Sequence, residues 1–100
     1  MSRFIRLGIP TPKRYLAYVR LMRAAKLFEN PGASISVVAN HLDYSSPQSF
    51  GRHVRLLLRM SASEFRRRYD GEGMLERFRA ELIAPYRVQF GELRPLAPGI

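Results

Sequence analysis

The chain has 100 residues, of which 46% are hydrophobic and 25% charged, and its formal net charge is +9. This length and composition predict one small soluble globular domain rather than a disordered segment. The absence of cysteine excludes disulfides and thiolate metal sites, and no apolar run approaches the roughly 20 residues of a membrane helix. The N-terminal residues lack the apolar block of a signal peptide, so we expect a cytoplasmic protein.

The positive charge is concentrated in the first two thirds of the chain. Residues 1–68 contain thirteen basic and three acidic side chains, a net charge of +10, whereas residues 69–100 contain four basic and five acidic ones, a net charge of −1. A field of this kind attracts a polyanion. The alternative is a generally basic surface without a specific partner.

The first expected helix begins at Thr11-Pro12, a pair typical of an N-cap followed by the first helical position, and runs to about Asn30. Pro31-Gly32 should end it. Its apolar side chains cover so wide an arc that the helix 12–30 must be covered on more than one side.

Two shorter helices follow. Ser34 is suited to cap a helix over residues 35–42, and Asp43 suits a tight or left-handed turn. Ser46 then caps a helix over residues 47–58, with Pro47 at its first position. The inner stripe of that helix consists of Phe50, Val54, Leu57 and Leu58.

The rest of the chain also has helical spacing. Residues 61–64 have the pattern of a capping box and predict a short fourth helix. A further helix should span residues 72–90, with a break or kink at Pro85. We therefore expect an all-α, homeodomain-like helix-turn-helix bundle of three to five helices. The expected organisation is an N-terminal arm (1–10), a core domain (11–69), a helical extension (70–92) and a flexible tail (93–100).

The helices 35–42 and 47–58, joined by a short turn, have the spacing of a helix-turn-helix, whose second helix enters the DNA major groove. Gln48 can pair with adenine, Arg52 with guanine and Ser49 with either base. The phosphate contacts are expected from Ser45, Ser46, His53 and Arg55. The arginines of this face have no acidic partner three or four residues away, so they repel one another, and a bound anion would relieve that repulsion.

Residues 34–69 also resemble the second helix-turn-helix of AraC/XylS-type transcription regulators. The similarity lies in the Ile-x-x-Val-Ala spacing from Ile35, the Leu-x-Tyr-Ser-Ser turn from Leu42, and the Ser-Phe-x-Arg run that ends at Arg52. Upstream, RYLAYVRLMRAAKLF resembles the long linker helix of the family. The resemblance implies sequence-specific binding of double-stranded DNA, control of transcription initiation, and base reading by residues 48, 49 and 52. We expect no cofactor.

The chain departs from the family pattern at three places. Asp43 and Arg59 stand where the family usually has glycine. The first of the two helix-turn-helix halves is missing, and residues 3–10 correspond only to the tail of its recognition helix. The flank of the helix 12–30 that this half would cover is then bare, or covered by the C-terminal extension, by a second copy or by a partner protein.

Two alternatives remain open from the sequence. The arginines could bind structured RNA, although no aromatic stacking motif accompanies them. The chain could be a dimerisation or protein-interaction module that acts through the apolar face of the helix 12–30. Catalysis is not expected, because His41 and His53 have no cysteine, paired carboxylate or nucleophile motif beside them.

Overall fold

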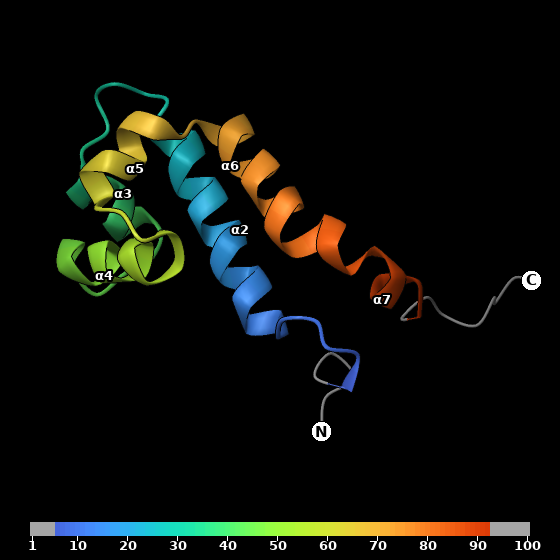
Figure 1. The fold of residues 1–100 in the computed structure, drawn as a ribbon. Helices are drawn as coiled ribbons and strands as arrows, with labels where there is room; N and C mark the ends of the chain where they lie inside the picture. The colour runs from blue at the N-terminus through green and yellow to red at the C-terminus, as the bar shows by residue number, and fades with distance from the viewer. Residues whose placement is uncertain (1–5, 93–100) are drawn as a thin grey trace, which may run out of the picture.

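A computed structural model describes residues 6–92, and within that range every regular element is helical (Figure 1). The prediction of an all-α fold is confirmed. The elements are α2 (Pro12–Leu27), α3 (Ile35–His41), α4 (Pro47–Leu58), α5 (Ala62–Arg68), α6 (Gly71–Phe78), a π-helical turn η1 (Arg79–Ile83), a 3₁₀ turn η2 (Ala84–Tyr86) and α7 (Arg87–Glu92).

Serine side chains begin three of these helices, at the positions expected from the sequence. The hydroxyls of Ser34, Ser46 and Ser61 each accept a hydrogen bond from the backbone N–H three residues later, at 3.0–3.1 Å. Each bond satisfies one of the N–H groups that the first turn of a helix leaves unpaired. Thr11 occupies the N-cap of α2 with extended backbone angles but without a side-chain cap bond.

The long helix α2 is shorter than predicted. It ends at Leu27 rather than near Asn30, because the N–H groups of Glu29 and Asn30 bond to carbonyls only three residues back. Such bonds tighten the last turn, as is common where a helix approaches a proline. The second helix likewise ends one residue early, at His41.

Two residues with side chains adopt the left-handed backbone conformation: Asp43 (φ 63°) and Arg59 (φ 61°). Both stand where the family that the sequence resembles usually has glycine, the residue that reaches this region without a steric penalty. The prediction that Asp43 suits a left-handed turn is confirmed. Gly8, just after the helical Arg6, also has a positive φ of 76°. Residues 3–5 of the predicted helix tail and the predicted flexible tail, 93–100, lie outside the described residues.

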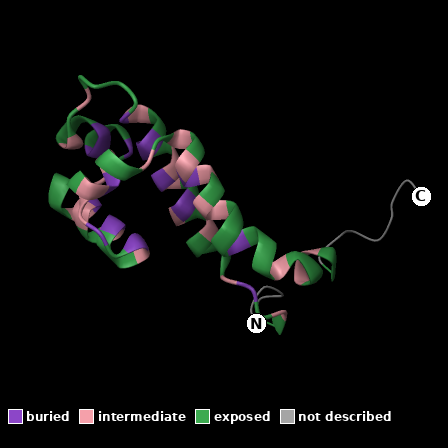
Figure 2. Cartoon of the chain, turned by 45° about the horizontal axis from the view of Figure 1, so that its top comes forward, coloured by how far each residue is buried: buried purple, intermediate pink, exposed green. Residues whose placement is uncertain are grey.

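The core of the helix-turn-helix forms where α3, α4 and α5 meet the C-terminal half of α2 (Figure 2). The rings of Phe28, Phe50 and Phe65 contact one another with centroids 6.1–6.5 Å apart. Of the predicted inner stripe of α4, Phe50, Val54 and Leu58 are buried and Leu57 is half-buried. This packing fixes the orientation of α4, so that its opposite face points outward.

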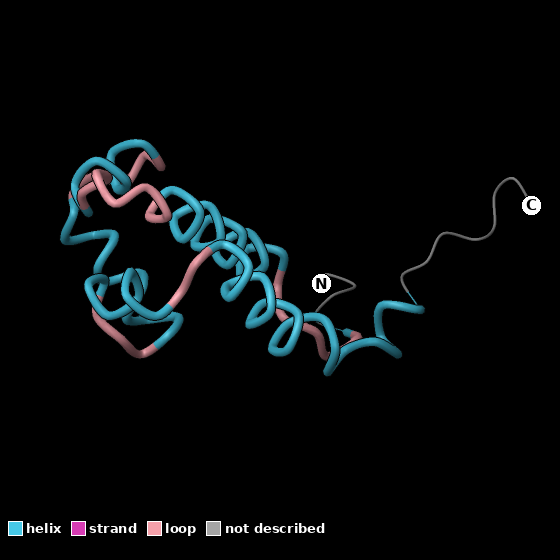
Figure 3. The backbone as a smooth tube through the Cα atoms, turned by 90° about the horizontal axis from the view of Figure 1, so that it is seen from above, coloured by secondary structure: helices cyan, strands magenta, loops and turns pink. Residues whose placement is uncertain are grey.

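The C-terminal extension packs along the other side of α2, as Figures 1 and 3 both show. The hydroxyl of Tyr15 donates to the Leu82 carbonyl at 2.6 Å, and that of the fully buried Tyr18 donates to Glu81 Oε2 at 2.6 Å. Of the alternatives for the broad apolar arc of α2, the extension is therefore the one observed. Leu16 remains 68% exposed.

The extension does not continue as one straight α-helix. The regular helix α6 stops at Phe78, widens into the π turn η1 and tightens into the 3₁₀ turn η2, which contains Pro85. A proline removes a backbone N–H and its ring clashes with the carbonyl four residues back, so the predicted break at Pro85 has a direct steric cause. The molecule measures 49 × 26 × 23 Å.

Candidate nucleic-acid interface

The outward face of α4 carries polar residues predicted to contact DNA. Gln48, Arg52 and Arg55 are exposed and fall within about 60° of one another on an ideal helical wheel, and the exposed Arg59 follows them as the C-cap residue. Within residues 6–92 none of these three arginines forms a salt bridge. The face therefore presents three uncompensated positive charges in a row.

The N-terminus of α4 is ordered by a small network of hydroxyl groups. Ser46 and Ser49 form a reciprocal capping box, in which each side chain accepts a bond from the other residue's backbone N–H. The Ser49 hydroxyl also donates to the Ser46 carbonyl at 3.0 Å, and it lies 3.3 Å from the Ser45 hydroxyl. The one proton of Ser49 is used within the cap, and its oxygen accepts from the Ser46 N–H and from the Ser45 hydroxyl. Ser49 can therefore accept from a base only where the base replaces the Ser45 hydroxyl.

An arginine from the long helix holds the turn between α3 and α4. Arg20 donates to the Leu42 carbonyl through both Nε (3.1 Å) and Nη2 (2.5 Å). Its guanidinium also lies over the Tyr44 ring, 3.9 Å from the centroid. A charged donor on an otherwise unused helix-end carbonyl and a cation–π contact both stabilise this arrangement. Arg20 thus fixes the turn to α2, a role that the sequence analysis did not assign.

His53, expected to hold a phosphate, is half-buried and not on the outermost face of α4. Its Nδ1 is hydrogen-bonded to the Tyr44 hydroxyl. Burial, and secondly the nearby Arg20 guanidinium, lower the pKa of His53 below its usual 6.5, so the ring is neutral near pH 7. When Tyr44 donates to Nδ1, the single ring proton resides on Nε2, which leaves one N–H for an oxygen acceptor.

The structure thus brings the predicted site residues together at α4 and the turn before it. Gln48, Arg52 and Arg55 are exposed, the three serines order the helix start, and His53 faces α2. Among residues 6–92 no cluster of three or more His, Asp or Glu side chains could hold a metal ion. In the same part of the chain no helix is long and apolar enough to cross a membrane.

Comparison with known proteins agrees with this geometry. The lactose operon transcription activator of Staphylococcus xylosus is 30% identical over 60 residues, which is 60% of this chain and 22% of that protein. The chain thus spans about a fifth of the length of that relative. No solved structure matches the chain. The family model of a helix-turn-helix domain, of the AraC type, matches residues 2–68, and the chain therefore belongs to the AraC-type helix-turn-helix family.

Proposed function

We propose that the chain binds double-stranded DNA in a sequence-specific manner and acts in the regulation of transcription initiation. The recognition helix is α4, inserted in the major groove with its N-terminal end toward the bases. The binding unit is residues 11–69, and residues 70–92 form an extension that supports α2. The S. xylosus relative is described as a transcription activator, which supports the same class of function.

The observation that carries the proposal is the uncompensated row of arginines on the outer face of α4. Three like charges within one helical face destabilise an isolated protein, because each repels the next. A DNA phosphate backbone and the acceptor edge of guanine both relieve that repulsion. The Arg20 contact with the turn supports the same function, since it holds the recognition helix in a fixed orientation.

The residues have separate roles in this proposal. Gln48 and Arg52 read bases by bidentate hydrogen bonds, and Ser49 offers an acceptor to a base. Arg55 contacts phosphate directly, while Ser45 and Ser46 orient phosphate at the start of the helix. His53 donates from Nε2 to a phosphate oxygen as a neutral group.

Substitution of single arginines tests these roles. Arg52→Ala should weaken binding of the preferred sequence by about 1–3 kcal/mol and relax the preference at one base pair. Arg55→Ala should weaken all sequences alike and reduce the salt slope of binding by roughly 1. Enrichment of bound fragments from random DNA, followed by anisotropy titrations, measures both effects. An unchanged base preference in Arg52→Ala would refute the base-reading role.

RNA binding is the alternative that must be distinguished from DNA binding. A titration with an RNA duplex of the same sequence separates the two, because the deep, narrow major groove of A-form RNA does not admit a helix. Equal affinity for both duplexes would show recognition of phosphate charge alone.

A second function, association with another copy or a partner protein, has one observation in its favour. Leu16 on α2 is 68% exposed, and Val19 is 37% exposed. Together they form what remains of the apolar face of α2 after the extension has covered its other flank. Sedimentation at rising concentration tests association, and a Leu16→Ser variant that sediments like the parent chain would exclude this face.

A further inference from the structure

A groove between α2 and α4 gathers positive charge from two distant parts of the sequence. It has a volume of about 490 Å³ and is lined by the first turns of α2 and by the C-terminal half of α4. Its lining residues include Lys13 and Arg14 from α2 and His53 and Arg59 from α4. A neighbouring hollow, which also contains Lys13 and His53, continues toward Arg20.

Among residues 6–92, no acidic side chain lines either hollow. In the described part of the chain, Lys13, Arg14 and Arg59 form no salt bridge, and Arg14 has only a distant contact with the Tyr18 ring, at 5.9 Å. By contrast, Lys26 near the other end of the same helix pairs with Glu29 at 3.2 Å. The cations in the first turns of α2 are therefore uncompensated within the described residues, as is Arg23 further along the same helix.

The groove is continuous with the recognition face. Arg59 lines the groove and is the C-cap residue of α4, the helix that carries Arg52 and Arg55. A duplex that lies against these arginines extends past the C-terminal end of α4, toward the start of α2. Phosphates follow one another along the DNA backbone at a regular spacing, so a second cationic site beside the first matches a polyanion of this kind.

We propose that this groove, with Lys13, Arg14 and Arg59 as its cations and His53 as a neutral donor, binds phosphates of the DNA backbone outside the base-reading contact. The proposal rests on the DNA-binding function proposed above and extends its footprint from α4 to the first turns of α2. It assigns a ligand-binding role to α2, which the resemblance to AraC/XylS-type regulators implies only to be a linker.

Exposed leucines raise the question of a protein ligand. Leu56, which lines the groove, is 75% exposed, and Leu16 in the neighbouring hollow is 68% exposed. Backbone phosphates are flanked by deoxyribose, whose carbons can contact such side chains, and the groove is lined by three cations, Lys13, Arg14 and Arg59, against two leucines, Leu56 and Leu57. The charge therefore favours DNA, and an acidic protein segment becomes an outcome of the test.

The experiment measures the salt dependence of DNA binding by the full chain. The double variant Lys13→Gln/Arg14→Gln and the parent chain are titrated against one labelled DNA duplex of mixed sequence, from about 50 to about 200 mM salt. Loss of two phosphate contacts reduces the slope of log K against log salt by about 1.8, so the parent loses roughly tenfold more affinity over this range. Arg79→Gln/Arg87→Gln removes the same charge from the C-terminal extension, and its slope should match the parent.

The outcomes separate this proposal from the proposed function itself. If the double variant binds the duplex with the parent's slope, the groove does not hold phosphate, although α4 still binds DNA. If the parent does not bind the duplex, the DNA-binding function fails and the groove proposal with it. A slope that changes equally in Leu56→Ser would overturn the proposal in favour of an apolar, protein-like ligand, since that variant removes no charge.

Discussion

The helices α4 and α6 both carry arginines, but they use them in opposite ways. In α6 and the π turn after it, Arg77 pairs with Glu81 at 2.9 Å and Arg79 pairs with Glu76 at 3.5 Å. Each glutamate lies three or four residues from its arginine, the spacing at which side chains meet on a helix. The arginines on the outer face of α4 have no such partner in the described part of the chain.

The difference shows which arginines of the chain serve the fold and which could bind an external anion. The arginines of α6 contribute to the fold, because their partners are intramolecular and Arg77 also donates to the Tyr69 hydroxyl at 2.8 Å. Those of α4 remain available to an external anion. The same residue type is therefore structural in one helix and a candidate binding group in the other, and the neighbouring carboxylates decide which.

The largest effect on DNA affinity is expected from a substitution that gives α4 a carboxylate of its own. Leu56 is exposed and lies four residues after Arg52 on the same helix, so Leu56→Glu supplies Arg52 with an intramolecular partner. We expect DNA affinity to fall by about 1–3 kcal/mol for the arginine contact, and further because the new carboxylate repels phosphate. Anisotropy titration measures the loss. Leu56→Gln, which adds no charge, is the control, and an equal loss in both variants would contradict the explanation.

Removing a carboxylate from the C-terminal extension tests whether its acidic residues stabilise the fold. Glu81 accepts the hydroxyl proton of Tyr18, which is fully buried, so Glu81→Leu leaves that hydroxyl without its acceptor. An unsatisfied buried donor costs about 1–3 kcal/mol of unfolding free energy. Urea unfolding followed by circular dichroism measures the change. DNA binding by the folded protein should remain as it was.

The control for that variant is Glu81→Gln, which keeps a side-chain carbonyl for Tyr18 and should lose less stability. Alkaline pH offers an independent readout. Burial, and secondly the bond to Glu81, raise the pKa of Tyr18 from 10.0 to about 12. A raised pKa contributes stability that is fully present below pH 10 and lost as the pH rises toward 12. A free energy of unfolding that does not change between pH 10 and pH 12 in the parent chain would contradict the buried Tyr18–Glu81 contact.

Substitution of Arg59, at the C-terminal end of α4, should change stability and DNA binding in opposite directions. Arg59 has the left-handed conformation, which glycine adopts without the clash that a Cβ causes. Arg59→Gly should therefore stabilise the fold by about 1 kcal/mol, while DNA affinity falls because a cation is lost. Asp43→Gly should stabilise by a smaller amount, since aspartate tolerates this region better. Thermal unfolding and titration of the same samples check both signs, and a destabilised Arg59→Gly would show that the side chain has a structural role.

These positions also show how far the sequence alone could lead. The bounds of α4 were predicted correctly, because Ser46 and Pro47 define its start by local chemistry. The docking of α6 on α2 could not be derived, because Tyr18 and Glu81 lie 63 residues apart and helical periodicity does not specify which helix a face will meet. For the same reason the contact of Arg20 with the Leu42 carbonyl could not be derived from the sequence.

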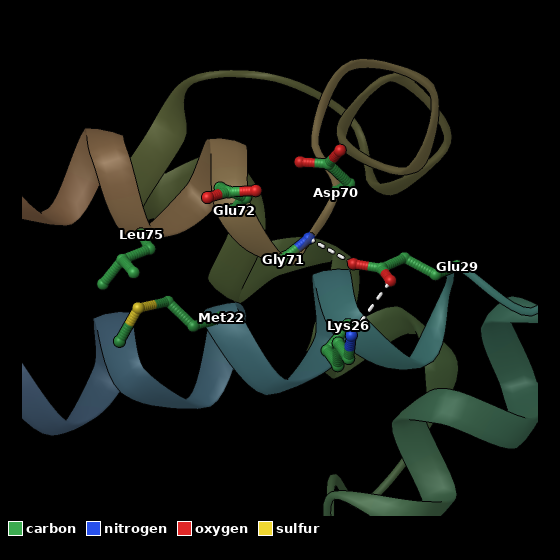
Figure 4. Close-up of a pocket in the computed structure, with 7 residues that line it drawn as sticks. All are labelled: Met22, Lys26, Glu29, Asp70, Gly71, Glu72 and Leu75. Atoms are coloured by element: carbon green, nitrogen blue, oxygen red, sulfur yellow. Dashed lines mark hydrogen bonds and ion pairs between the residues drawn. The ribbon is translucent and has the colours of Figure 1, made fainter.

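The smallest expected effect concerns the junction between α2 and α6, shown in Figure 4. Glu29 accepts a hydrogen bond from the Gly71 N–H at 2.8 Å, at the N-terminal end of α6, and it also pairs with Lys26. The bond from Gly71, and secondly the Lys26 ammonium, lower the pKa of Glu29 below 4.5. A lowered pKa contributes stability that is present above pH 4.5 and lost as the pH falls through the folded-state value.

Glu29→Gln should therefore unfold slightly more easily than the parent chain near neutral pH, and the gap should narrow as the solution is acidified. Parallel urea unfolding of the two proteins across the acidic range measures this gap, which stays small because the carboxylate is exposed to solvent. The unfolding of Asp70→Asn is measured for comparison, because Asp70 caps the same helix by accepting a hydrogen bond from the Gly73 N–H at 2.7 Å. A gap between Glu29→Gln and the parent that stays constant with pH would mean that the Glu29 charge does not hold the extension on α2, and that apolar packing with the Tyr15 and Tyr18 bonds suffices.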